Sequence, residues 1–177
     1  MDYSNITKLD LSNKGLTKLP DLSIYTNLKE LNCSYNKITS LDNLPLTLTY
    51  LNCTANQITT LDNLPSTLTE LECAYNKITS LDNLPSTLIE LYCYQNQITS
   101  LDYLPLTLKI LCCSGNKIAK LDNLPLTLTE LYCCENLITS LDNLPPTIIE
   151  FSCSANPIEF DYITPTLENI RTHNKTL

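Results

Sequence analysis

The chain has 177 residues, nine cysteines, two glycines and a formal net charge of −8. Its length predicts a single domain, and its acidic charge argues against a nucleic acid or an anionic membrane as partner. The N-terminal segment MDYSNITKLDLS contains no basic region followed by an apolar stretch, so we expect no secretory signal and a cytoplasmic location. Nine cysteines without such a signal predict free thiols in a reducing compartment.

Residues 1–27 form a first unit that differs from the later copies. Its apolar positions recur with a 22-residue spacing, and Lys14 stands where every later copy has an asparagine. The end repeats of a stacked array are commonly atypical because one of their faces has no neighbour. We therefore expect residues 1–27 to act as an N-terminal capping repeat.

Residues 28–147 contain six copies of one 20-residue sequence. Each copy reads L-x-x-L-x-C-x-x-N-x-I-x-x-L-D-N-L-P-x-T, and only Tyr103 interrupts the Asp-Asn step. A fixed period of this length is typical of a solenoid, in which each unit buries its apolar face against the next. Residues 148–177 predict an atypical last repeat and a C-terminal cap, which gives one continuous domain.

Within each copy, apolar and polar residues alternate around Leu31 and Cys33 and their equivalents. This alternation predicts a short strand, and in-register stacking makes the strands parallel neighbours about 4.8 Å apart. The rest of each copy carries a proline and is too short for a normal helix. The predicted fold is an α/β-type repeat solenoid, right-handed, with a concave parallel sheet and a convex side that is extended or 3₁₀ with little or no α-helix.

One column of asparagines follows the predicted strands at a constant distance. Where the strand turns into the convex arc, backbone groups lose their sheet partners and must be paired, and an amide side chain can both donate and accept. We expect this column to be structural. Its members are Asn36, Asn56, Asn76, Asn96, Asn116, Asn136 and Asn156.

The motif resembles the leucine-rich-repeat family, whose signature is L-x-x-L-x-L-x-x-N/C-x-L. The 20-residue length and the Leu-Pro-x-Thr-Leu junction are similar to the short repeats of secreted bacterial effectors, although those usually have Leu-Pro where this chain has Leu41-Asp42. Near-identical copies with cysteine in the third core column also resemble repeat proteins of giant viruses that infect amoebae. The resemblance implies a host-directed adaptor, located in the host cytoplasm or the virion if the source is viral.

Strand residues that do not point inward are expected to line the concave face. They combine tyrosine with glutamate, a mixture typical of a binding face, and we predict that they bind a protein or peptide of basic character, with glutamates steering the approach. The predicted contact residues are Glu70, Glu72, Glu90, Tyr92, Tyr94, Glu130, Tyr132 and Glu135. The aromatic patch of Tyr92, Tyr94 and Tyr132 is expected around Cys112 and Cys134.

Two other functions stay open on the sequence alone. Near-identical copies with modest caps could let solenoids associate end to end in a particle or filament. Alternatively, Cys112 and Cys134 project near one face and could form a metal or thiol site, although a zinc site needs four convergent ligands and the sole histidine is His173. No Ser/His/Asp set, phosphate loop or paired-acid motif is present, so we predict no enzyme activity, no cofactor and no bound metal.

Overall fold

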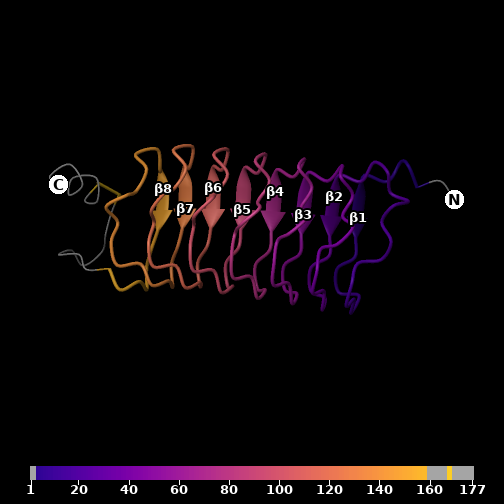
Figure 1. The fold of residues 1–177 in the computed structure, drawn as a ribbon, viewed down its shortest axis with the longest axis horizontal. Helices are drawn as coiled ribbons and strands as arrows, with labels where there is room; N and C mark the ends of the chain where they lie inside the picture. Colours follow the sequence, from indigo (N-terminus) through magenta and orange to yellow (C-terminus); the bar gives the residue numbers. More distant parts are fainter. Residues whose placement is uncertain (1–2, 159–166, 169–177) are drawn as a thin grey trace.

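The computed structural model describes residues 3–158 and 167–168. In this part of the chain, eight three-residue strands lie side by side in one parallel sheet (Figure 1), and no residue from 3 to 158 is helical. The strands are β1 (Lys8–Asp10), β2 (Glu30–Asn32), β3 (Tyr50–Asn52), β4 (Glu70–Glu72), β5 (Glu90–Tyr92), β6 (Ile110–Cys112), β7 (Glu130–Tyr132) and β8 (Glu150–Ser152). The predicted solenoid with a parallel sheet is confirmed.

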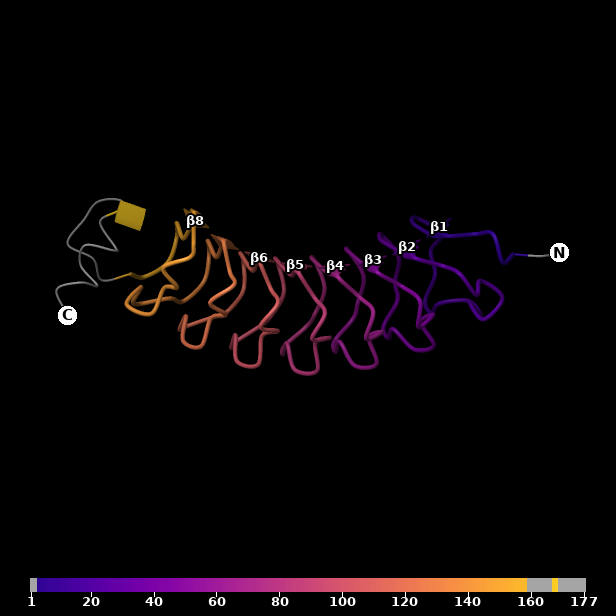
Figure 2. The same ribbon diagram turned by 90° about the horizontal axis from the view of Figure 1, so that it is seen from above.

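The pairing of the strands follows the sequence repeat. Leu31 of β2 pairs with Leu51 of β3, whereas Leu9 of β1 pairs with Leu31, so the first step is the longer one. Seen from above, the sheet lines one side of the molecule, which curves inward near β4 and β5, and the turns fan out on the other side (Figure 2). The sheet therefore lies on the concave face.

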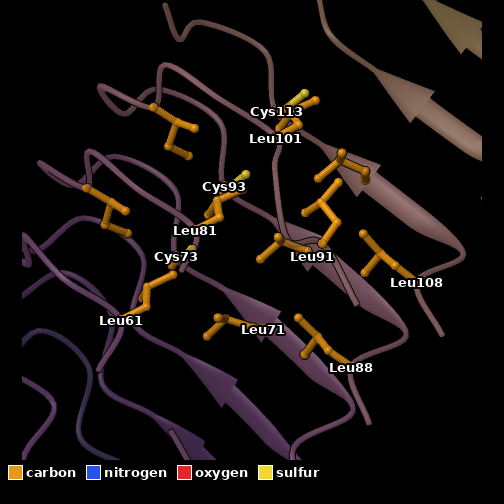
Figure 3. Packing of buried hydrophobic residues seen from close by; sticks show 14 of the residues in the cluster. Leu61, Leu71, Cys73, Leu81, Leu88, Leu91, Cys93, Leu101, Leu108 and Cys113 are labelled. Atoms are coloured by element: carbon orange, nitrogen blue, oxygen red, sulfur yellow. The ribbon is translucent and has the colours of Figure 1, made fainter. Parts of the chain in front are cut away.

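The core consists of rows of identical side chains that stack from one repeat to the next. Figure 3 shows such rows, with Cys73, Cys93 and Cys113 in one and Leu71 and Leu91 in another. All five side chains are fully buried. Burying one leucine contributes about 1.5–3 kcal/mol. The apolar face of each repeat is buried by the neighbouring repeats, so the array is stable only as a stack.

The asparagine column joins adjacent repeats at the end of each strand. Asn96 donates hydrogen bonds to the carbonyls of Cys73 (3.0 Å) and Cys93 (3.1 Å), and its Oδ1 accepts from the backbone N–H of Ile78 (3.0 Å). Equivalent bonds recur from Asn56 to Asn156, while Asn36 reaches back to Leu11 and Leu16 of the first unit. Each amide thus pairs backbone groups that have no partner in the sheet.

Hydrogen bonds also join the convex turns of adjacent repeats. The Nδ2 of Asn123 lies 3.3 Å from the carboxylate of Asp102, and Asn83 pairs with Asp62 in the same way. The hydroxyl of Thr67 donates to the carbonyl of Leu48, 19 residues earlier (2.6 Å). Both contacts hold the return arc against its neighbour, so the turns keep the same spacing as the strands.

The C-terminal cap was predicted for residues 148–177. Most of the predicted C-terminal cap falls on residues 159–166 and 169–177, which lie outside the described residues. Across the residues that are described, no helix has the length and apolar character that crossing a bilayer requires.

Candidate binding face

The strands display their first and third residues on the concave face. In β4, Glu70 and Glu72 are half-buried on either side of the fully buried Leu71, and β2 to β7 all repeat this pattern. Six residues of the predicted site lie on strands in this way: Glu70, Glu72, Glu90, Tyr92, Glu130 and Tyr132. Tyr94 and Glu135 lie in the turns that follow β5 and β7.

Tyrosine hydroxyls on this face are bonded to glutamates. The hydroxyl of Tyr92 donates to Glu90 (2.9 Å), and that of Tyr132 donates to Glu150 (2.6 Å) as well as to Glu130 (3.3 Å). A phenol that donates to a carboxylate makes a charge-assisted hydrogen bond, which fixes both side chains. Several carboxylates of the face are therefore oriented before any partner arrives.

Glu72 is held from the preceding strand. Tyr50 donates its hydroxyl proton to Oε1 (2.7 Å), and the Nδ2 of Asn52 donates to Oε2 (2.8 Å). Burial, followed by the bond to Glu72, raises the pKa of Tyr50 to about 12. Tyr50 therefore keeps its proton near neutral pH and continues to donate to this carboxylate.

The three tyrosines predicted to form one patch have different partners. Tyr94 packs edge-on against Tyr75, with ring centroids 5.4 Å apart and an interplanar angle of 84°. Tyr92 and Tyr132 turn instead to glutamates. The aromatic surface next to Tyr94 is formed by Tyr75, on the N-terminal side, and the structure places Tyr92 and Tyr132 among the carboxylates.

The face has a strong surplus of negative charge. In the described residues the one ion pair joins Lys8 to Glu30 (2.9 Å) at the N-terminal end of the sheet. Farther along, burial raises the pKa of the Glu70 carboxyl, and the charges of Glu90 and Glu72 raise it further. Crowded carboxylates without a cation repel one another, so a basic partner would relieve a repulsion that folding alone leaves in place.

Cys112 and Cys134 are free thiols with opposite properties. Burial raises the pKa of Cys112 to about 11. Burial acts on Cys134 in the same direction, but hydrogen bonds with Ser152, Ser154 and Ser114 together outweigh it and lower the pKa of that thiol. The Sγ of Cys134 lies 2.9 Å from the Oγ of Ser152. Among the described residues, no group of three or more His, Cys, Asp or Glu side chains could hold a metal ion.

Five residues of the same columns were not among the predicted contact residues: Tyr35, Tyr50, Tyr75, Gln95 and Glu150. Tyr50 and Glu150 hold predicted glutamates or tyrosines by hydrogen bonds, and Tyr75 contacts Tyr94. Their positions are visible in the sequence because each belongs to the same repeat column as a predicted residue. What the columns do not reveal is the direction in which each side chain leans.

Comparison with known proteins agrees with this geometry. A family model for leucine-rich repeats in two copies matches residues 4–46 and 26–66. The solved structure of a Shigella effector LRR domain is 31% identical, with a TM-score of 0.78, and the match covers 88% of this chain and 71% of that one. This chain belongs to the leucine-rich-repeat family. A comparison with curated protein sequences found no match.

Two further leucine-rich-repeat structures are much longer than this chain. The functional domain of InlJ from Listeria monocytogenes, described as including a cysteine ladder, is 42% identical with a TM-score of 0.75, and the match covers 89% of this chain and 37% of that one. YopM from Yersinia pestis, a leucine-rich effector protein, is 31% identical with a TM-score of 0.82, over 88% and 44% of the two chains. This chain spans less than half the length of either.

Proposed function

We propose that this leucine-rich-repeat protein is a non-catalytic interaction module that binds a basic protein or peptide on its concave face. The observation that carries the proposal is the row of strand carboxylates, of which Glu90 and Glu130 accept hydrogen bonds from tyrosine hydroxyl groups. Glu70, Glu90 and Glu130 occupy the same position of β4, β5 and β7. Among the glutamates of β1 to β8, ion pairing is confined to Glu30, which contacts Lys8.

Steering and anchoring would be divided among different side chains. Carboxylates raise the association rate with a basic partner, while rigid tyrosines supply contact area at a low cost in conformational entropy. Similarity to a Shigella effector domain and to YopM supports a role directed at a protein of a host cell. The module would then act as an adaptor that presents or sequesters that protein.

Affinity capture from a host-cell extract, with the wild type and two matched variants as bait, tests this function. The test variant carries Glu70→Gln, Glu90→Gln and Glu130→Gln, and the control variant carries Asp42→Asn, Asp82→Asn and Asp142→Asn. Both remove three negative charges, but the control changes exposed residues in the convex turns. A protein retained by the wild type and the control and lost with the test variant would support the concave face. Equal retention by all three would contradict it.

A second capture addresses the aromatic residues. A variant with Tyr92→Ser, Tyr94→Ser and Tyr132→Ser removes three rings and leaves every glutamate in place. If the tyrosines contribute contact area, this variant should retain less of the same protein while circular dichroism shows an unchanged fold. Full retention would restrict the binding function to the carboxylates.

A further inference from the structure

Three tyrosines form an aromatic ridge along the edge of the sheet where the strands end. Tyr35 and Tyr75 lie three residues after β2 and β4 and expose 61% and 55% of their surface. Tyr94, two residues after β5, packs edge-on against Tyr75. We call Tyr35, Tyr75 and Tyr94 the tyrosine ridge. Tyr35 and Tyr75 were not among the contact residues predicted from sequence.

The backbone conformation of the ridge is unfavourable for tyrosine. Tyr35 has a φ of 54° and Tyr75 a φ of 52°, in the left-handed region. Glycine and asparagine adopt this region readily, whereas a bulky side chain there is an outlier. The equivalent position has a positive φ in every copy and holds smaller or more flexible residues elsewhere: Ala55, Gln95, Gly115, Glu135 and Ala155. A large, exposed ring in a strained position gains little from burial, so its presence favours a role outside folding.

Ala55 is the small residue between two members of the ridge, and we call the space above it, between Tyr35 and Tyr75, the slot. Tyr35, Ala55 and Tyr75 occupy successive steps of one backbone ladder, in which each N–H donates to the carbonyl of the next repeat (2.8, 2.9 and 3.0 Å). Two steps of about 4.8 Å separate Tyr35 from Tyr75 by roughly 10 Å. Ala55 lies one ladder step, about 5 Å, from the backbone of each tyrosine. A cation held above Ala55 would lie between the two tyrosine positions, and a cation within about 6 Å of a ring centroid makes a cation–π contact.

The last residue of β4, Glu72, is a fixed carboxylate. Glu72 precedes Tyr75 by three residues and is held by Tyr50 and Asn52. Within the described residues no lysine or arginine forms an ion pair with it. The side chain that fits between aromatic rings and also pairs with a carboxylate is arginine, because its guanidinium is planar, always charged and donates in a fork.

We propose that the slot between Tyr35 and Tyr75 receives an arginine side chain of the basic partner. The guanidinium stacks on the tyrosine ridge above Ala55 and donates to Glu72. This inference rests on the proposed function, because it specifies which basic residue the concave face selects. Lysine satisfies the charge of Glu72 but cannot stack as a plane between two rings.

Three short peptides test the selection. They are acetylated and amidated Gly/Ser nonapeptides that carry three arginines, three lysines or three citrullines, and their dissociation constants are measured by titration calorimetry at low salt. We expect the arginine peptide to bind about three- to tenfold more tightly than the lysine peptide. The citrulline peptide, which is flat but uncharged, should not bind measurably.

Filling the slot tests its location. Ala55→Tyr places a third ring between Tyr35 and Tyr75 without removing an aromatic residue. Ala155→Tyr is the matched control, because Ala155 has nearly the same φ (55°, against 56° for Ala55) at the other end of the sheet. We expect Ala55→Tyr to reduce the affinity for the arginine peptide to that for the lysine peptide, and Ala155→Tyr to leave the affinity unchanged.

The substitution Tyr75→Asn removes one side of the slot and distinguishes a binding role of Tyr75 from a purely structural one. Tyr75→Asn puts a residue that tolerates the left-handed region into a strained position. We expect its Tm to rise by about 2–4 °C while its affinity for the arginine peptide falls about three- to tenfold. A fall in both quantities would mean that Tyr75 serves stability, and the inference would be wrong.

The outcomes separate this inference from the proposed function. If arginine and lysine peptides bind equally and Ala55→Tyr has no effect, while the Glu70→Gln, Glu90→Gln, Glu130→Gln variant loses binding, the slot is refuted and the acidic face remains supported. If no basic peptide binds the wild type, the proposed function fails and the inference fails with it. The same holds if the triple glutamate-to-glutamine variant binds basic peptides as well as the wild type. Binding of the citrulline peptide equal to that of the arginine peptide would also refute the slot.

Discussion

The side-chain amide of Gln95 lies 3.4 Å from the carboxylate of Glu135, two repeats farther along the solenoid. It reaches that far by crossing Gly115, the residue at the same position of the intervening copy. A Cβ on Gly115 would overlap the amide of Gln95. The missing side chain of one repeat thus allows a contact between its two neighbours.

Gly115→Ala should destabilise the protein by about 1–2 kcal/mol, because Gly115 has a φ of +66° and the left-handed region disfavours a Cβ. The amide of Gln95 is the flexible end of a long side chain and can move aside. We therefore expect nearly the same cost in a Gln95→Ala background. Urea unfolding of the two single variants and the double variant measures both values. A cost that vanishes with Gln95→Ala would instead assign the effect to the overlap.

Asn96→Ala should lower the free energy of unfolding by about 1–3 kcal/mol. The substitution leaves the N–H of Ile78 and the carbonyls of Cys73 and Cys93 without their amide partner, and buried unpaired polar groups are costly. Asn156→Ala is the comparison, because Asn156 is only half-buried near the end of the array and water can replace part of its bonding. Urea unfolding should show a smaller loss for Asn156→Ala. Equal and negligible losses at both positions would contradict a structural role for the column.

Tyr103→Asn should stabilise the protein by about 1 kcal/mol. Tyr103 has a φ of 65° and exposes 82% of its surface, so the backbone strain is not offset by burial. Asparagine at this position in other repeats also pairs with the aspartate of the preceding copy, as Asn123 does with Asp102. The reverse change, Asn123→Tyr, should destabilise by a similar amount. Thermal melts of both variants provide the test, and a lower Tm for Tyr103→Asn would contradict the strain at this position.

Glu70→Gln should raise the Tm at pH 7. The pKa of Glu70 is raised in the folded state above its ordinary value of 4.5, by burial and then by repulsion from Glu90 and Glu72. The folded state therefore holds this proton more tightly than the unfolded state, and its stability decreases as the pH rises from about 4.5 through the raised pKa. Glutamine removes the charge that causes this loss.

Melting curves at pH 4 and pH 7 distinguish this effect from a change in packing. The gain in Tm from Glu70→Gln should be present at pH 7 and should nearly disappear at pH 4, where the wild-type carboxyl is largely protonated. Glu30→Gln is the control, because Glu30 pairs with Lys8 and its loss should not raise the Tm. An identical shift at both pH values would show that charge is not the cause.

Cys134 should be the most reactive thiol of the native protein. Its pKa is lowered by hydroxyl groups, whereas burial raises the pKa of Cys112 to about 11, and the thiolate is the reactive form. We expect iodoacetamide at pH 7.5 to label Cys134 at least about tenfold faster than Cys112. Mass spectrometry of timed digests provides the rates. Ser152→Ala should slow the labelling of Cys134, and equal rates at the two cysteines would contradict the assignment.

Much of the fold could be predicted from particular residues. The recurrence of Leu31, Cys33 and Asn36 every 20 residues predicts the strand, the core row and the turn, because identical sequences must adopt equivalent positions in a stack. The 22-residue first unit likewise appears in the pairing of Leu9 with Leu31. The candidate face was harder to predict. Tyr92 and Tyr94 are neighbours in sequence, yet one bonds to Glu90 and the other packs on Tyr75.

Sequence alone determined the period, and with it the backbone register and the residues that face the core. The physical reason is that burial acts on every copy alike, so a repeated apolar pattern has one stacked arrangement. Only the tertiary structure decided which exposed side chains meet, because those contacts depend on rotamers and on small differences between copies. Gly115, for example, lets Gln95 reach Glu135 two repeats farther along. These departures from the repeat distinguish one part of the face from another.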